Sequence, residues 1–215
     1  MRSEPAAAAP HVAHHFESLA KQEHAARLGM WLFLATEVLL FTALFAAYGV
    51  YRYLFAEAFA ESSRHMETWI GVVNTLVLVT SSFTVAMGLH FATRGRGRMT
   101  ALFYGLSVLL ALVFLGLKAL EYEHHFELGQ LPGRFYTYPG VTAPGASLFF
   151  TLYFLITGLH AIHVVVGMTV LSVVAVLSAR GRFTAEYHTP VELAGLYWHL
   201  VDLIWIFVFP LIYLI

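Results

Sequence analysis

The 215-residue sequence has no cysteine, and only 12% of its residues are charged. Without cysteine the chain forms no disulfide, binds no zinc through thiolates and ligates no iron–sulfur cluster of its own. The net charge of −1 at pH 7 shows no basic excess, and the sequence has no glycine-rich loop of the kind that binds phosphates. These absences give no support to nucleic acid as a partner.

Apolar residues, in contrast, make up 59% of the chain, and the mean hydropathy is +0.72. Such values are typical of a membrane protein rather than of a soluble domain. The apolar residues gather in five runs, near 28–50, 69–91, 101–120, 147–178 and 193–215. Each run reaches the roughly 20 residues that a helix needs to cross about 30 Å of hydrocarbon. Because the runs are continuous rather than alternating, they favour helices over a β-barrel.

We therefore predict an all-α fold: a polytopic membrane protein with a bundle of five transmembrane helices over residues 28–215, preceded by an N-terminal tail over 1–27. The positive-inside rule predicts its orientation. Eight basic residues fall on the side of the N-terminus, namely Arg2, Lys21, Arg27, Arg94, Arg96, Arg98, Arg180 and Arg182, and four fall on the opposite side, namely Arg52, Arg64, Lys118 and Arg134. This places the N-terminus in the cytoplasm, or on the equivalent side of an organelle membrane, and the C-terminus outside.

The apolar stretch MWLFLATEVLLFTALF carries one carboxylate, Glu37, near the middle of the first predicted helix. An acid at that depth must face protein, where it either binds a partner on another helix or stays protonated. His160 and His163 are candidate partners, since a spacing of three places them on one face of the fourth helix. Alternatively, each histidine bonds a backbone carbonyl or a hydroxyl between closely packed helices, a packing that Gly158 and Gly167 favour.

The fifth predicted helix has two polar residues three positions apart, His199 and Asp202, flanked by Trp198 and Trp205. A charge-assisted pair along one face would lower the cost of both groups in the membrane, and it would also serve as structural glue. The second helix adds residues that indicate interhelical hydrogen bonds, namely Asn74, Thr75, Ser81 and Ser82.

Haem ligation is a further possibility for the membrane histidines, because haem can be held between histidines on facing helices. The candidates are His90, His160, His163 and His199. A spacing of three along one helix does not by itself assemble haem, and no second matching pair is present. We therefore expect no cofactor and no metal in this chain.

Several segments together carry a recognisable pattern over residues 24–213: GMWLFLATEVLLFTALFAAY, NTLVLVTSSFTVAMGLH, LKALEYEHHF, FFTLYFLITGLHAIHVVVGM and GLYWHLVDLIWIFVFPLIY. In combination they resemble subunit III of the haem–copper respiratory oxidases, the cytochrome c oxidase subunit III family. The specific combination is an intramembrane Glu, the sequence GLHAIHVVVG and a terminal YWHLVDLIW.

The resemblance implies a non-catalytic subunit, without haem or copper of its own, that packs on the catalytic subunit I. In that family it supports proton uptake and the longevity of turnover, and it holds lipids in a cleft between its helices. Subunit II and a small subunit IV are further candidate partners, and the bacterial plasma (inner) membrane is the expected location. Family motifs match Glu37, His160, His163, Glu121 as the acid closing the third helix, Trp198, His199 and Asp202; none is a catalytic residue.

Two departures from the larger family form are visible. That form has seven helices, and this chain is similar to the shorter five-helix form that lacks the first two, which form one wall of the lipid cleft. Another subunit would have to supply that wall. The connection over 126–145 is also long, and we expect it to meet a donor protein or an extra subunit.

Three rival functions stay open from the sequence. One is an accessory subunit of a nitric oxide reductase, which shares the same helix motifs. The second is a haem-bearing membrane anchor, which predicts a visible absorption band in the isolated chain. The third is a small transporter or channel, which predicts activity in vesicles without partners.

Overall fold

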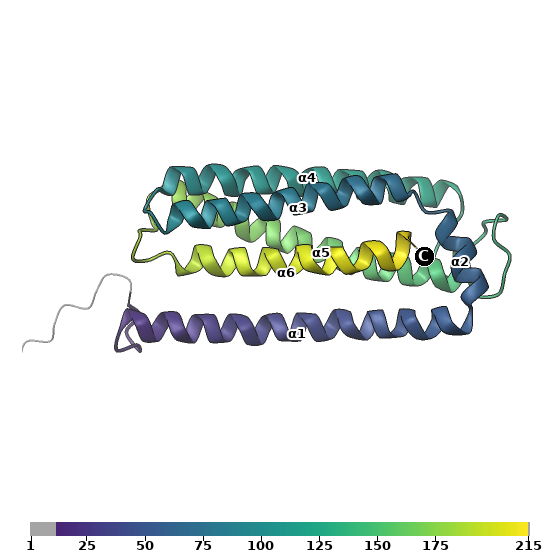
Figure 1. Cartoon of the computed structure of the whole chain (residues 1–215), viewed down its shortest axis with the longest axis horizontal. Helices are drawn as coiled ribbons and strands as arrows, with labels where there is room; N and C mark the ends of the chain where they lie inside the picture. Colours follow the sequence, from purple (N-terminus) through teal and green to yellow (C-terminus); the bar gives the residue numbers. More distant parts are fainter. Residues whose placement is uncertain (1–11, 215) are drawn as a thin grey trace, which may run out of the picture.

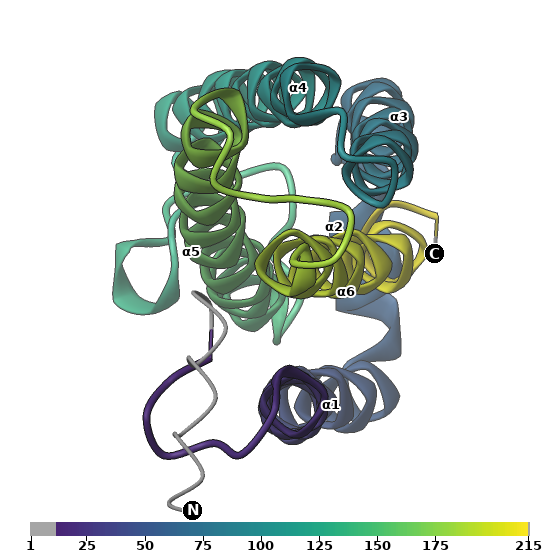
Figure 2. The same cartoon turned by 90° about the vertical axis from the view of Figure 1, so that its left-hand side faces the viewer.

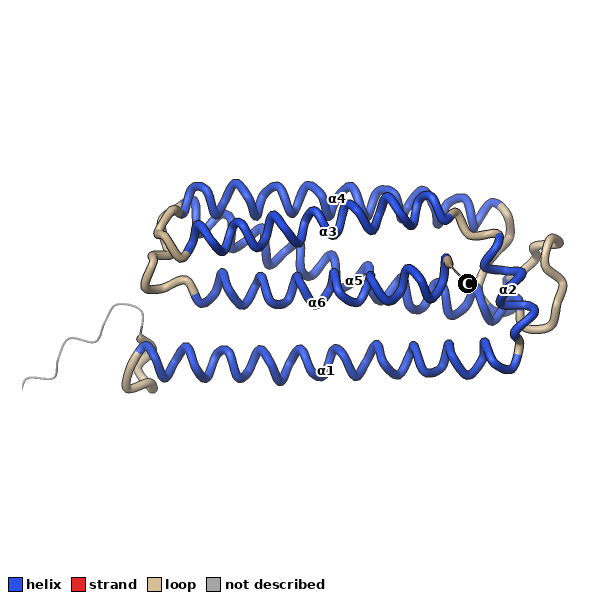
Figure 3. The backbone as a smooth tube through the Cα atoms, in the orientation of Figure 1, coloured by secondary structure: helices blue, strands red, loops and turns tan. Residues whose placement is uncertain are grey.

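A computed structural model describes residues 12–214. Within this range the chain forms five long helices, α1 (Leu19–Leu54), α3 (Thr68–Ala92), α4 (Gly97–Glu127), α5 (Ala146–Ala179) and α6 (Thr189–Tyr213), and a shorter helix, α2 (Ala56–Arg64). All five long helices are apolar enough to cross a membrane. Figure 3 shows helices and loops but no strand in the described part. The predicted all-α bundle with five spans is confirmed.

The helices run beyond the apolar runs at several ends. α1 begins at Leu19, well before residue 28, because Ser18 caps it and accepts a hydrogen bond from the backbone N–H of Lys21. The sequence suggested that Glu121 closes this helix, but α4 continues to Glu127, so Glu121 lies inside it. The beginning of the N-terminal tail, residues 1–11, lies outside the described residues.

Helix α2 was not predicted, because it has only nine residues and its polar residues mask its apolar face. It lies across one end of the bundle and buries Ala58 and Phe59. Phe59 packs between Tyr48 of α1 and Phe149 of α5, with ring centroids 5.3 and 5.4 Å away. The helix therefore joins the end of α1 to the rest of the molecule.

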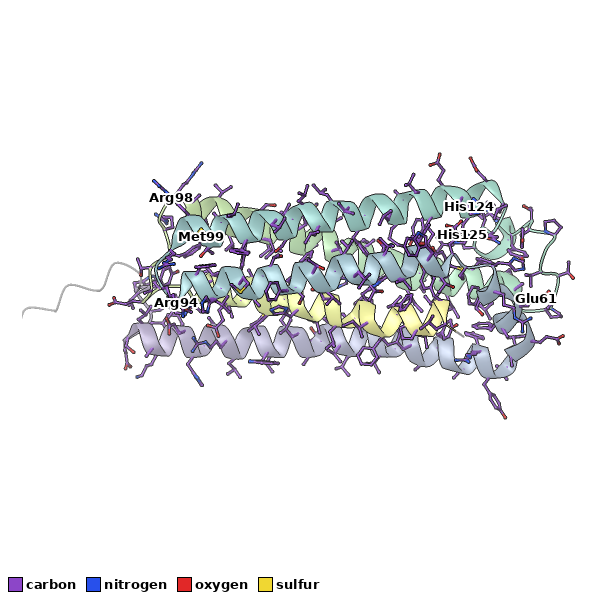
Figure 4. The ribbon with its side chains drawn as sticks, turned by 45° about the horizontal axis from the view of Figure 1, so that its top comes forward. Glu61, Arg94, Arg98, Met99, His124 and His125 are labelled. Carbon is purple, nitrogen blue, oxygen red and sulfur yellow. The ribbon has the colours of Figure 1, made fainter. Side chains whose placement is uncertain are left out.

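Helices α3, α4, α5 and α6 form a four-helix bundle in which each helix packs on two neighbours, in the cyclic order α3–α4–α5–α6. Helix α1 lies outside this bundle, beside α5 and α6 (Figures 1 and 2). Five exposed arginines lie at one end, which we call the arginine end: the α3–α4 and α5–α6 connections carry Arg94, Arg96, Arg180 and Arg182, and the first turn of α4 carries Arg98. Figure 4 shows Arg94 and Arg98 there, and Glu61, His124 and His125 at the opposite end, which we call the α2 end.

The long connection between α4 and α5 contains a short 3-10 turn, Gly133–Phe135, and lies at the α2 end. It folds back on itself, because Thr137 N–H donates to the Gly129 carbonyl at 2.9 Å and the Tyr136 hydroxyl donates to the Val141 carbonyl at 2.7 Å. Its contact with a donor protein or an extra subunit stays a prediction.

Candidate functional site

Several contacts hold α1 against the rest of the molecule, and three of them mark its two ends and its middle. At the arginine end, the Arg27 guanidinium forms a two-pronged ion pair with Glu192 of α6, with the shortest distance 2.8 Å. At the α2 end, α1 is anchored by the aromatic packing of Tyr48 on Phe59. At mid-depth, Glu37 Oε2 lies 2.8 Å from His163 Nε2 of α5. The carboxylate of the first predicted helix is therefore the central polar link between α1 and the bundle.

The hydrogen bonds of His163 limit where its protons lie. Its Nδ1 is 2.8 Å from the Leu159 carbonyl oxygen, which only accepts, so Nδ1 carries a proton. Nε2 then either accepts from a neutral Glu37 carboxylic acid or, in an imidazolium, donates to the carboxylate. Both side chains are mostly buried, with 16% of Glu37 and 13% of His163 exposed. The two groups therefore share one proton across a contact that is largely shielded from solvent.

We expect Glu37→Gln to leave α1 docked and Glu37→Leu to loosen it. The glutamine amide donates to the neutral Nε2 and preserves a hydrogen bond, so its cost stays below about 1 kcal/mol. Leucine leaves Nε2 buried without a partner, at a cost of about 1–3 kcal/mol. Unfolding of both variants in detergent measures the difference. Equal stability of the two variants would mean that the bond does not hold α1.

His160 does not join this pair, although it is only three residues from His163. Its ring is fully buried inside the four-helix bundle, 5.2 Å from the Trp205 ring and 5.6 Å from the Phe114 ring, measured between centroids. Neither ring nitrogen of His160 has a hydrogen-bond partner among the described residues. The two histidines of the fourth predicted helix therefore lie in different surroundings, His160 inside the bundle and His163 against α1.

The spacing of His199 and Asp202 suggested that the two side chains pair with each other, but the structure does not pair them. His199 Nδ1 lies 2.6 Å from the Ser82 hydroxyl of α3 instead. Asp202 is buried, and within the described residues no group meets either carboxyl oxygen at hydrogen-bonding distance and angle, although the Ser82 hydroxyl is near enough to interact with it. Trp198 is fully buried and donates its indole N–H to Ser81 of α3 at 2.9 Å. The side chains of the terminal motif therefore link α6 to α3 and do not pair with one another.

A second buried polar group centres on Glu121 and Lys118 of α4, and we call it the Lys118 cluster. Lys118 Nζ lies 3.1 Å from Glu121 Oε2, and both side chains are at most 4% exposed. The Tyr153 hydroxyl of α5 donates to Glu121 Oε1 at 2.8 Å, and the Tyr213 hydroxyl of α6 donates to the same atom at 2.5 Å. Both hydroxyls also accept from Lys118 Nζ, at 3.0 and 2.9 Å. The Lys118 cluster thus joins three helices near the α2 end.

Sequence reasoning missed Lys118, which it counted as a basic residue on the outer side. A signal was present: Lys118 and Glu121 are three apart in LKALEYE, a spacing that places opposite charges on one helix face. Two tyrosines from α5 and α6 complete the cluster. Because they are far from Lys118 in the sequence, no local spacing pattern indicated them. With Lys118 buried, three of the four basic residues assigned to that side remain there.

An apolar groove of about 630 Å³ separates α1 from α6. Its lining includes Trp31, Leu34 and Val38 of α1 and Leu200 and Leu203 of α6. His199 is its one polar lining residue that titrates. A second apolar groove, of about 410 Å³, lies beside α1 next to α5 and α6.

In the part of the chain that the structure describes, no three His, Asp or Glu side chains are grouped so as to hold a metal ion. The four histidines considered as haem ligands are instead dispersed. His90 lies at the arginine end beside Arg94, His160 is inside the bundle, His163 faces α1 and His199 meets α3. The four histidines thus have different neighbours in the described chain.

Comparison with known proteins relates the whole chain to one family. The family model for cytochrome c oxidase subunit III matches residues 10–215. Cytochrome c oxidase subunit 3 of Thermostichus vulcanus is 32% identical over 189 residues, which cover 87% of this chain and 86% of that protein. Quinol oxidase subunit 3 of Bacillus subtilis is 27% identical over 187 residues, covering 87% and 85%.

A longer relative, cytochrome c oxidase subunit 3 of Cyprinus carpio, is 30% identical over 199 residues, which cover 87% of this chain but 68% of that protein. Relatives of similar length and a longer one therefore each match 87% of this chain. With a match over residues 10–215 and five membrane-spanning helices, the chain belongs to the cytochrome c oxidase subunit III family.

Proposed function

We propose that the chain is the non-catalytic subunit III of a proton-pumping haem–copper terminal oxidase in the bacterial plasma (inner) membrane. It packs on the catalytic subunit I, which carries the haem and copper centres, with subunit II and a small subunit IV as further neighbours. Its contribution is to stabilise that core, to support proton uptake and to hold lipid. The observation that carries the proposal is the family match over residues 10–215.

The position of α1 supports a packing role. Most of its large apolar side chains, among them Trp31, Leu32, Leu39 and Tyr53, are exposed between 38% and 86% in the isolated chain. In a membrane such a surface meets either lipid or the helices of another subunit. The apolar groove beside it, lined by α1 and α6, suits an acyl chain. Lipid and a partner helix therefore share the α1 side in this proposal.

The arginine end supports the predicted orientation. Four arginines lie in the two connections there and Arg98 lies in the first turn of α4, and Glu186 is the one acidic residue of those connections. The start of α1 lies at the same end (Figure 1). By the positive-inside rule this end faces the cytoplasm, so the N-terminus is cytoplasmic and the C-terminus is outside.

Co-purification tests the assignment. The tagged chain is extracted from its own membranes in mild detergent, its partners are identified by mass spectrometry, and oxygen uptake is recorded with reduced cytochrome c and, separately, with a quinol. We expect a haem–copper core that consumes oxygen with one of the two donors. A nitric oxide reductase core, or a chain that runs alone with its own haem band, would overturn the proposal.

The choice of donor follows from the same experiment. The relatives include both cytochrome c oxidase subunits and quinol oxidase subunits, and their identities to this chain are similar. Uptake with cytochrome c alone would assign the complex to the first group, and uptake with the quinol alone would assign it to the second.

A further inference from the structure

Four fully buried side chains lie at one depth in the four-helix bundle: Asn74 of α3, Phe114 of α4, His160 of α5 and Trp205 of α6. Each is 16 to 19 residues from the arginine end of its helix, which corresponds to about 24–29 Å at about 1.5 Å per residue. The rings of His160, Phe114 and Trp205 contact one another. We call these four residues the central layer.

The polar members of the central layer have no protein partners. Among the described residues, nothing hydrogen-bonds to the amide oxygen or nitrogen of Asn74, or to either ring nitrogen of His160. Asp202, one turn of α6 closer to the arginine end than Trp205, has the Ser82 hydroxyl near it but accepts no hydrogen bond of good geometry at either carboxyl oxygen. Leaving a buried polar group without a hydrogen bond costs about 1–3 kcal/mol. The four unpaired atoms of Asn74 and His160, with the carboxyl group of Asp202 beyond them, therefore indicate a bound ligand that bonds to them.

The chemistry of these atoms identifies the ligand. Asn74 offers both a donor and an acceptor, a neutral His160 offers one of each, and an ionised Asp202 only accepts. The ligand must therefore donate and accept hydrogen bonds. A cation would be repelled by Lys118, which is near enough to act on His160 electrostatically. Water is small and neutral and does both, and it is the usual partner of otherwise unpaired buried groups.

We propose that the central layer and Asp202 form a binding site for water inside the four-helix bundle. Ala111 of α4 lies at the depth of Asp202 and is fully buried, so that level has a small side chain where the level above has Phe114. The bound water occupies the interior beside Asn74, His160 and Asp202.

The proposed water site has a polar group on each side. On the side of the α2 end, Lys118 Nζ of the Lys118 cluster lies over the Trp205 ring at 5.7 Å. On the side of the arginine end, Ser82 lies near Asp202 and bonds to His199, which lines the groove between α1 and α6. The proposed water site thus lies between the Lys118 cluster and the groove.

Hydroxyl-radical footprinting of the chain within its purified complex tests the proposal. Radiolysis of bound water produces radicals that oxidise the side chains next to it, and mass spectrometry locates the oxidation. Trp205 and Trp198 are matched probes, because both lie on α6, are fully buried and donate their indole N–H to a hydroxyl. We expect Trp205 to be oxidised several-fold faster than Trp198. Equal, slow oxidation of both would overturn the proposal.

The variant Asn74→Leu gives a second readout. In a hydrated layer it removes a water ligand, so the oxidation rate of Trp205 falls towards that of Trp198 and the unfolding midpoint does not rise. In a dry layer it removes two unsatisfied polar atoms and the midpoint rises, which would contradict the proposal. If the variant does not accumulate, the comparison of the two tryptophans in the unmodified chain decides.

Discussion

Replacing Lys118 by methionine is expected to destabilise the chain by about 3–5 kcal/mol, because it removes the ammonium that pairs with the buried Glu121 at 3.1 Å and leaves only the more distant His125, 3.8 Å from the carboxylate, as a basic neighbour. The two side chains are 4% and 1% exposed, so solvent screens neither. Tyr153 and Tyr213 still donate to Glu121 after the substitution, but two neutral hydroxyls do not neutralise a carboxylate. Unfolding of the purified chain by titration with a denaturing detergent measures the loss.

The double variant Lys118→Met with Glu121→Gln separates charge from packing. It removes both charges and keeps an amide oxygen that accepts from the two tyrosines, so we expect most of the lost stability to return. The coupling energy of the cycle then reports the ion pair. A double variant as unstable as the sum of the two single variants would show that the residues act independently.

An exposed lysine in a similar pair is the matched control. Lys21 pairs with Glu17 four residues away on the same stretch of chain, but their side chains are 63% and 80% exposed. Surface pairs contribute between 0 and about 1 kcal/mol, so Lys21→Met is expected to change the unfolding midpoint little. A Lys118→Met variant that behaves like Lys21→Met would contradict the burial of the Lys118 cluster.

The sequence predicted the elements that the bilayer dictates. Five continuous apolar runs of sufficient length had to become five helices, since only helices and closed barrels satisfy the hydrogen-bonding groups of the backbone in hydrocarbon. The same reasoning required a protein partner for Glu37, and one of the two candidate histidines, His163, is that partner. The length of an apolar run predicts a spanning helix, and the depth of Glu37 within its run predicts a protein partner. Both the length and the depth can be read from residues that are neighbours in the sequence.

The sequence did not predict which residues meet across helices. The spacing of His199 and Asp202 allowed a pair, but Ser82 of α3 takes His199 Nδ1. Lys118 near a helix end looked like a lysine at the membrane surface, but Glu121 together with Tyr153 and Tyr213, 35 and 95 residues further along the chain, makes a buried position tolerable. Rotation and register between helices come from tertiary packing, which a single helix does not encode.

The two glycines of α5 that the sequence marked for close packing differ in the structure. A Cβ added at Gly167 would lie 2.8 and 2.9 Å from two ring atoms of Trp198, whereas at Gly158 its nearest neighbour is the Tyr122 hydroxyl at 3.8 Å. The Trp198 ring does not move freely, because it is fully buried and its indole N–H donates to Ser81. One glycine is therefore required by α6, and the other is not.

We expect Gly167→Ala to destabilise the chain by about 1–3 kcal/mol through overpacking against Trp198. Gly158→Ala, the control in the same helix, is expected to be neutral or slightly stabilising, since alanine is favoured over glycine in a helix by about 0.5–1 kcal/mol. Detergent unfolding of the two variants compares them directly.

A second substitution locates the clash. Trp198→Phe removes the part of the ring that Gly167→Ala would strike, so the combined variant is expected to lose less stability than the two single changes added together. The bond from the indole to Ser81 is lost in Trp198→Phe whether or not the alanine is present, and therefore cancels in the cycle. If the combined loss equalled the sum, Trp198 would not be the side chain that holds α5 and α6 at this distance, and Tyr197, 3.2 Å from the same Cβ, would be the next residue to test.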